Sequence, residues 1–214
     1  MDEDIAVINK TTRNERIKNF FIKNKKKLVI LLSLIILLIL SYFAYGEFDK
    51  RNEIKIANKY NNSIINFISG DKLNVESEMI KIINAKDKTY SPLALYFLLD
   101  NNVINSKEQI NSLFDILINE TKVDKEINNL IIYKKALYNS EFETENNLLK
   151  ILNPIINTES IWKSHGLYLM AEYFLSKNEK QKSKEFFEKI LILENSNPQI
   201  KLEAQKRIQR DFSE

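Results

Sequence analysis

An uncharged apolar run of 19 residues constrains this chain more than any other feature. The run, LVILLSLIILLILSYFAYG at 28–46, contains 13 residues of the Leu, Ile, Val and Phe type. Each such residue favours insertion near the bilayer centre by about 0.3–0.6 kcal/mol, so together they favour insertion by roughly 4–8 kcal/mol. A helix of this length is about 28 Å long, close to the thickness of the hydrocarbon core. The sequence therefore predicts a single transmembrane anchor at 28–46, with the lipid bilayer as its partner.

Charge is divided unevenly between the two sides of this run. Residues 1–27 carry eight Lys or Arg and four Asp or Glu, whereas residues 47–214 carry 24 and 25. Basic flanks stay on the cytoplasmic side of a membrane, so we expect 1–27 to be a cytoplasmic basic segment and 47–214 to lie across the membrane. The lysines that set this topology directly precede the run: Lys23, Lys25, Lys26 and Lys27.

Two alternatives concern this N-terminal part. A cleaved signal peptide would also place an apolar run here, and Ala44-Tyr45-Gly46 offers small residues at a cleavage spacing. The basic segment and the apolar run are both longer than in a usual signal peptide, which favours an uncleaved anchor. Ile17, Phe20 and Phe21 have helical spacing among basic residues, so the cytoplasmic segment either lies on an anionic leaflet or is a solvated topology signal.

Past residue 46 the apolar residues recur with the period of an α-helix. Ile110, Leu113, Phe114 and Leu117, for example, follow i, i+3, i+4, i+7 spacing. The chain has only three glycines and three prolines, too few for the frequent turns of a β-sandwich or barrel. We therefore predict an all-α body with helices at 47–69, 72–85, 92–101, 106–120, 124–140, 144–153, 160–177, 180–194 and 198–211.

Capping signals set these predicted boundaries. Four residue pairs have the composition of a helix N-terminus: Ser91-Pro92, Ser106 with Gln109, Thr121 with Asp124, and Asn197-Pro198. Gly70 predicts the end of the helix that continues from the anchor, and Pro154 predicts the end of another. The connections are short, so neighbouring helices should pack as antiparallel hairpins.

Small residues suggest that the hairpins repeat. Ala94, Ala136 and Ala171 fall in the first helices of three successive pairs, 42 and 35 residues apart, whereas the tetratricopeptide period is 34. The last pair fits best, although Asn178-Glu179 replaces the usual Gly-Asp turn and Pro198 lies about three residues late. We predict a single N-terminal transmembrane helix followed by a tetratricopeptide-like α-solenoid of helical hairpins. A generic α-bundle is the alternative.

The residues that catalysis usually requires are scarce. The chain has no Cys and one His, so thiolate zinc sites and histidine-based catalysis are not expected, and His165 has no nucleophile near it in sequence. The glycines are at least 24 residues apart, which excludes a phosphate-binding glycine loop. We therefore predict no enzyme activity, no cofactor and no metal. The nearly neutral body also argues against a nucleic-acid surface.

The order of these features resembles a known family. An acidic and then basic N-terminus, one anchor and a degenerate tetratricopeptide-like body, including Ser91 to Tyr96 and the repeat from Trp162 to Phe187, are similar to the YfgM-like ancillary subunit family of the bacterial SecYEG translocon. The resemblance covers nearly the whole chain but depends on architecture more than on signature residues. It implies a bacterial inner-membrane protein with a cytoplasmic N-terminus and a periplasmic domain. The implied partners are the Sec translocon channel and a periplasmic chaperone.

Binding is the remaining function. Stacked hairpins expose one face lined mainly by the first helix of each pair. Aromatic side chains expected there form the candidate partner groove: Tyr96, Tyr133, Trp162 and Tyr168. The alternative is that these rings fill gaps between hairpins. The sequence thus predicts a membrane-anchored protein-binding adaptor. A scaffold for cell division or outer-membrane assembly, acting through homo-oligomerisation, is the alternative function.

Overall fold

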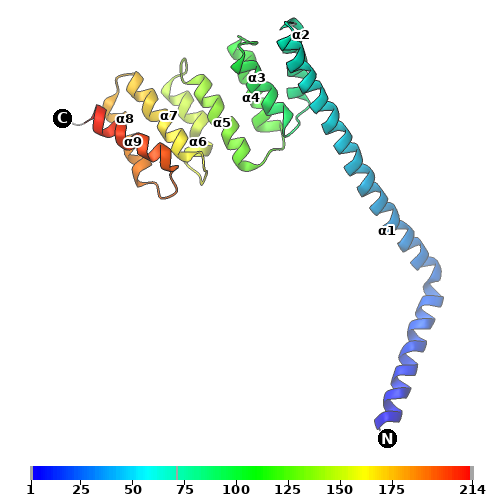
Figure 1. Cartoon of the computed structure of the whole chain (residues 1–214). Helices are drawn as coiled ribbons and strands as arrows, with labels where there is room; N and C mark the ends of the chain where they lie inside the picture. Colours follow the sequence, from blue (N-terminus) through cyan, green and yellow to red (C-terminus); the bar gives the residue numbers. More distant parts are fainter. Residues whose placement is uncertain (1, 71, 213–214) are drawn as a thin grey trace. The chain divides into compact units, whose positions relative to one another are not determined.

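The computed structural model describes residues 2–70 and 72–212, and in these residues the chain forms helices and no strand. Figure 1 shows the helices in chain order. Their bounds are α1 (Asp2–Ile68), α2 (Lys72–Asn84), α3 (Tyr90–Asp100), α4 (Lys107–Glu120), α5 (Lys125–Asn139), α6 (Glu145–Ile156), α7 (Lys163–Ser176), α8 (Lys180–Ile192) and α9 (Pro198–Asp211). The predicted all-α class is confirmed, and each predicted body helix has a counterpart.

The chain divides into two compact units, residues 1–55 and 56–214. The first unit is formed by α1 up to Lys55, and its apolar run is exposed from residue 29 to residue 46, with Leu28 partly exposed. This part of α1 is the one stretch among the described residues that is long and apolar enough to cross a membrane. A helix that is apolar on all sides and touches no protein requires another apolar environment. The structure thus supports one membrane-compatible helix, while its orientation stays a prediction.

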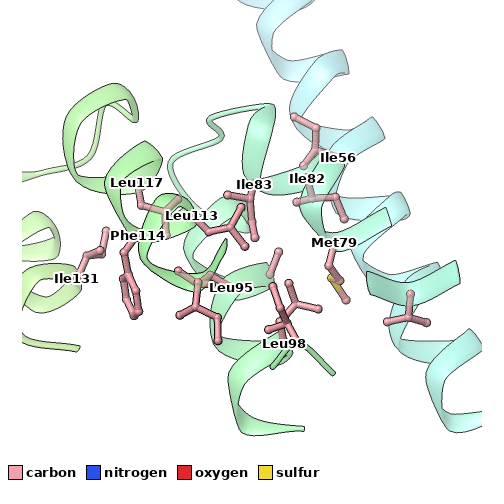
Figure 2. Close-up of a cluster of buried hydrophobic side chains, with 14 residues drawn as sticks. Ile56, Met79, Ile82, Ile83, Leu95, Leu98, Leu113, Phe114, Leu117 and Ile131 are labelled. Carbon is pink, nitrogen blue, oxygen red and sulfur yellow. The ribbon is translucent and has the colours of Figure 1, made fainter. Parts of the chain in front are cut away.

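The last turns of α1 belong to the second unit, the helical body. Ile56, Tyr60, Ile64 and Phe67 have helical spacing and contact the first core cluster. The Tyr60 ring lies 5.7 Å from that of Tyr90, and the Phe67 ring meets that of Phe97 edge-on at 5.2 Å. Figure 2 shows part of this cluster, to which α1 contributes Ile56. The helix that contains the apolar run therefore also supplies core residues to the body.

Fully buried alanines mark the places where the hairpin helices approach each other. Ala94, Ala136, Ala171 and Ala204 have no exposed surface, and they lie on α3, α5, α7 and α9. Two buried serines serve the same contacts. The Ser183 hydroxyl on α8 donates to the Ala171 carbonyl on α7 at 2.8 Å, and the Ser91 hydroxyl on α3 donates to the Ile82 carbonyl on α2 at 2.7 Å. Small side chains thus let neighbouring helices come close enough for a serine hydroxyl on one helix to reach a backbone carbonyl on the next.

The core consists of three clusters along the body. The first joins the end of α1 with α2 to α5, the second joins α5 to α8, and the third joins α7 to α9. From α2 to α9 each helix contacts its neighbours in sequence, and α2, α5 and α7 also contact α4, α7 and α9, respectively. Each of the three clusters therefore joins at least three helices that follow one another in the chain.

Several predicted boundaries are confirmed and three are wrong. Ser106 and Asn197 accept backbone N–H groups as N-caps. Ser91 lies inside α3, because its hydroxyl serves the contact with α2 instead. Thr121 is the C-cap of α4, and its hydroxyl donates to the Ile116 carbonyl instead of capping α5. The N-cap of α5 is Asp124, whose side chain makes no cap hydrogen bond.

Pro154 does not end its helix, since α6 continues to Ile156. A proline in a helix removes one backbone hydrogen bond. Here Ile155, the next residue, is fully buried against Leu148 and Leu152 in the second cluster. Burial of a side chain of this size favours folding by about 1.5–3 kcal/mol, which offsets the lost hydrogen bond.

Asparagine takes the role of glycine at two helix ends. Asn102 and Asn178 have φ angles of 50° and 61°, in the left-handed region. The Asn178 N–H donates to the Leu175 carbonyl, and the Glu179 N–H donates to that of Phe174, which is the Schellman arrangement. The Asn178-Glu179 turn without glycine is therefore a regular helix end, because Asn tolerates this backbone conformation better than other side chains.

Gly166 on α7 lies directly against side chains of α6. A Cβ atom at this position would lie 3.1 Å from Ile156 Cγ2 and 3.5 Å from Leu152 Cδ2. A larger side chain would therefore push the two helices apart.

We predict that Gly166→Val destabilises the body by about 1–3 kcal/mol, because the added atoms overpack the α6–α7 contact. Urea unfolding of the full chain in detergent, followed by the fluorescence of Trp162, the single tryptophan, measures the change. Gly46→Val is the matched control, since nothing lies within 4 Å of a Cβ at that position. Equal unfolding midpoints for the two variants would show that the α6–α7 contact tolerates the added volume.

Candidate partner-binding surface

The four aromatic residues predicted to line a groove lie in three different places. All four are half-buried. Tyr96 on α3 contacts the first core cluster, Tyr133 and Trp162 contact the second, and Tyr168 on α7 contacts the third. The structure therefore brings Tyr133 and Trp162 together and keeps Tyr96 and Tyr168 apart from them. Their role in binding a partner stays a prediction.

Tyr133 and Trp162 form an aromatic group with His165. The Tyr133 and Trp162 rings are stacked at 5.8 Å with 20° between their planes. The His165 ring lies 4.9 Å from Trp162 and 5.8 Å from Tyr133. Burial lowers the pKa of His165, because the charged imidazole loses solvation, and a hydrogen bond with the Ile161 backbone opposes this effect. The group joins α5 to the start of α7.

A polar network holds Trp162 in this position. Glu126 on α5 accepts hydrogen bonds from the Ser160 hydroxyl at 2.8 Å and the Ile161 N–H at 3.2 Å. The Ser160 hydroxyl oxygen in turn accepts from the Trp162 N–H at 3.1 Å and from Asn129 Nδ2 at 3.0 Å. The loop before α7 is thus bound to α5 by side chains more than 30 residues away in sequence.

Tyr168 fills the contact between α7, α8 and α9. Its ring meets Phe187 edge-on at 5.4 Å. The neighbouring Arg207 on α9 pairs with Glu172 on α7 and with Asp211, the latter at 3.0 Å. Burial raises the pKa of Tyr168. These contacts stabilise the last hairpin.

Tyr96 lines a cleft between the N-terminal halves of α3 and α5, which we call the α3–α5 cleft. The cleft has a volume of about 510 Å³. Its lining is mostly apolar, with lysines at the edge, and consists of Lys88, Thr89, Pro92, Leu93, Tyr96, Lys122, Val123, Asp124, Ile127 and Leu130. Burial raises the pKa of Tyr96 to about 12, so the tyrosine stays neutral near pH 7.

A second apolar cleft lies between α6, α7 and α8, and we call it the α6–α8 cleft. Its volume is about 630 Å³. Leu149, Ile156, Leu167 and Phe186 contribute apolar surface, and Ile192 at its edge is 82% exposed. The charged residues of the lining have no net charge, because they are two glutamates and two lysines: Glu159, Lys163, Lys189 and Glu194. Sequence periodicity did not reveal either cleft, because each combines residues from separate helices.

No group of three or more His, Asp or Glu side chains arranged to hold a metal ion occurs among the residues that the structure describes. A comparison with protein-family models, with curated proteins and with solved structures gave no match.

We predict that protonation of His165 quenches Trp162 fluorescence with a midpoint below pH 6.5, the ordinary value for histidine. The folded-state pKa is lowered, so the unfolded chain binds the proton first. The contribution of His165 to stability is thus fully present above pH 6.5 and is lost as the pH falls through the folded-state pKa. A fluorescence titration of the full chain in detergent measures the midpoint.

His165→Gln is the control for this titration, because it keeps a polar side chain and removes the titrating group. The quenching step should disappear in this variant. A midpoint at or above pH 6.5 in the unmodified chain would contradict the buried position of the ring.

Proposed function

We propose that this chain is a single-pass inner-membrane adaptor that binds proteins through a tetratricopeptide-like periplasmic body. In this proposal the body engages the Sec translocon channel together with a periplasmic chaperone or an emerging client. The observation that carries the membrane-anchored binding role is the combination of one exposed apolar helical segment with a helical body that has two apolar clefts. The Sec channel and the chaperone are named from the family resemblance alone.

The hairpin stack supports a binding role rather than catalysis. Buried alanines recur on α3, α5, α7 and α9, so each pair packs on the next and leaves surface clefts between them. Such stacks present side chains of several helices to a partner protein. Apolar side chains contribute about half or more of each cleft's lining, and charged side chains contribute three or four residues, a mixture that suits the binding of protein segments.

The anchor would supply the mechanism, which is tethering. A membrane-bound body is confined to a thin layer near the membrane surface, and this confinement raises its effective concentration toward partners in the same layer. Modest affinity in each cleft is then sufficient for association. The lysines at 23 and 25–27 favour the orientation in which the body faces the periplasm.

The alternative role, an envelope scaffold that acts through self-association, has one observation in its favour. Ile65 and Ile68 near the end of α1 are 58% and 78% exposed, although they neighbour residues of the core. A second copy could cover them. Sedimentation of the full chain in detergent separates the two roles, since the scaffold requires an oligomer and the adaptor does not.

The test of the adaptor is recovery of partners from the native membrane. We predict that tagged full-length chain, solubilised in mild detergent, recovers the Sec channel and a periplasmic chaperone by mass spectrometry. Leu93→Asp with Ile127→Asp in the α3–α5 cleft, or Ile192→Asp in the α6–α8 cleft, should lower recovery at least tenfold. These positions are exposed in the free chain, and a bound partner would bury the new carboxylates at a high cost in free energy.

Leu137→Asp is the matched control for these variants. Leu137 is 44% exposed, close to the 41% of Leu93 and 43% of Ile127, and it lines neither cleft. Its recovery should equal that of the unmodified chain. Recovery of no translocon or chaperone component would overturn the proposed function. Recovery of division or outer-membrane assembly proteins alone would favour the scaffold.

A further inference from the structure

The α3–α5 cleft differs from the α6–α8 cleft in its charge. Lys88 and Lys122 line the α3–α5 cleft, and Lys134 lies one turn farther along α5 with its Nζ 5.1 Å from the Tyr96 ring. Asp124 is the one acidic residue in the lining. The α6–α8 cleft instead has two lysines and two glutamates. The positive charge is therefore local, since the sequence from 47 onward has a net charge of −1.

Lys88, Lys122 and Lys134 make no ion pair among the described residues, so their charges are not neutralised within the body. Most body lysines with described side chains are likewise unpaired, and ion pairs are formed by Lys81, Lys86, Lys135, Lys182 and Lys206. The distinguishing feature of the three lysines is that they lie together around one apolar cleft. Unpaired cations around an apolar surface complement a partner that brings its own carboxylates.

The cleft as a whole has the size of a binding site. Its volume of about 510 Å³ falls within the roughly 300–1,000 Å³ of common ligand sites. Leu93 and Ile127 are 41% and 43% exposed on opposite sides, so an apolar side chain placed between them would cover both. Pro92, Tyr96 and Leu130 complete the surface.

We propose that the α3–α5 cleft binds a short extended segment of a partner protein in which apolar side chains are flanked by Asp or Glu. The apolar side chains pack between Leu93 and Ile127, and the carboxylates face Lys88, Lys122 and Lys134. This inference depends on the proposed adaptor function and names the chemistry of the partner that this cleft selects.

The experiment uses the full chain in nanodiscs of phosphatidylcholine and three fluorescein-labelled peptides, measured by fluorescence anisotropy. The first peptide has the sequence Glu-Asp-Leu-Phe-Asp-Ile-Glu. The second replaces every acidic residue by Lys, and the third replaces every apolar residue by Ser. We expect the first peptide to bind at least tenfold more tightly than either of the others, and its affinity to fall as salt screens the lysines.

Variants locate the site. Lys88→Glu with Lys122→Glu should lower the affinity for the acidic peptide at least tenfold and raise the affinity for the lysine peptide. Lys150→Glu with Lys180→Glu is the matched control, because both lysines are exposed and neither lines the cleft. This control should change the affinity by less than twofold. Leu93→Ser with Ile127→Ser should also weaken binding tenfold, and circular dichroism checks that each variant is folded.

Three results would overturn the inference: no preference for the acidic peptide, equal weakening by the control pair, or unchanged binding in the serine variant. If partners are still recovered from membranes while the chain binds the three peptides equally, the adaptor function stands. The inference that the α3–α5 cleft selects an acidic segment is then wrong. If the unlabelled chain sediments as an oligomer that Lys88→Glu with Lys122→Glu dissociates, the occupant is a second copy and the inference is likewise overturned.

Discussion

The exposed apolar surface of α1 is the constraint on which the rest of the structure depends. Between residues 28 and 46 the helix has no charge and no protein contact, so water is an unfavourable environment for it. The same helix continues without a break to Ile68, and its last turns contribute Ile56, Tyr60 and Phe67 to the core of the body. The body therefore contains part of the helix that would anchor it, and removal of that part would open the first core cluster.

Close packing of small residues accounts for the form of the body. Fully buried alanines on α3, α5, α7 and α9 let neighbouring helices approach, and half-buried aromatic rings fill the spaces that remain. The stack of Tyr133 on Trp162 joins α5 to α7, and Tyr168 on Phe187 joins α7 to α8. Where no ring fills the space completely, as between α3 and α5, an open cleft remains. The packing that stabilises the body thus also leaves the cleft that we propose as a binding surface.

Local signals predicted most of the fold, and long-range contacts account for what they missed. Ser106 and Asn197 cap helices because a cap depends only on the next three residues. Ser91-Pro92 has the residue types of a helix N-cap, but Ser91 lies inside α3, where its hydroxyl contacts α2. Sequence spacing alone does not distinguish a cap from such a contact between helices. The hydrogen bond between Glu126 and Ser160 joins residues that are far apart in sequence. The lysines of the α3–α5 cleft also come from separate segments of the chain. Helical periodicity carries no signal for either feature.

The most direct test of the account is the sidedness of α1, and the chain is suited to it because it has no Cys. Single cysteines at Asn19, Ser33 and Ser69 can be labelled in spheroplasts with a membrane-impermeant maleimide. If α1 spans the membrane with the body outside the cytoplasm, Ser69→Cys is labelled in intact spheroplasts, Asn19→Cys only after permeabilisation, and Ser33→Cys in neither case. Free labelling of Ser33→Cys, or labelling of Asn19→Cys and Ser69→Cys from the same side, would contradict a membrane-spanning α1.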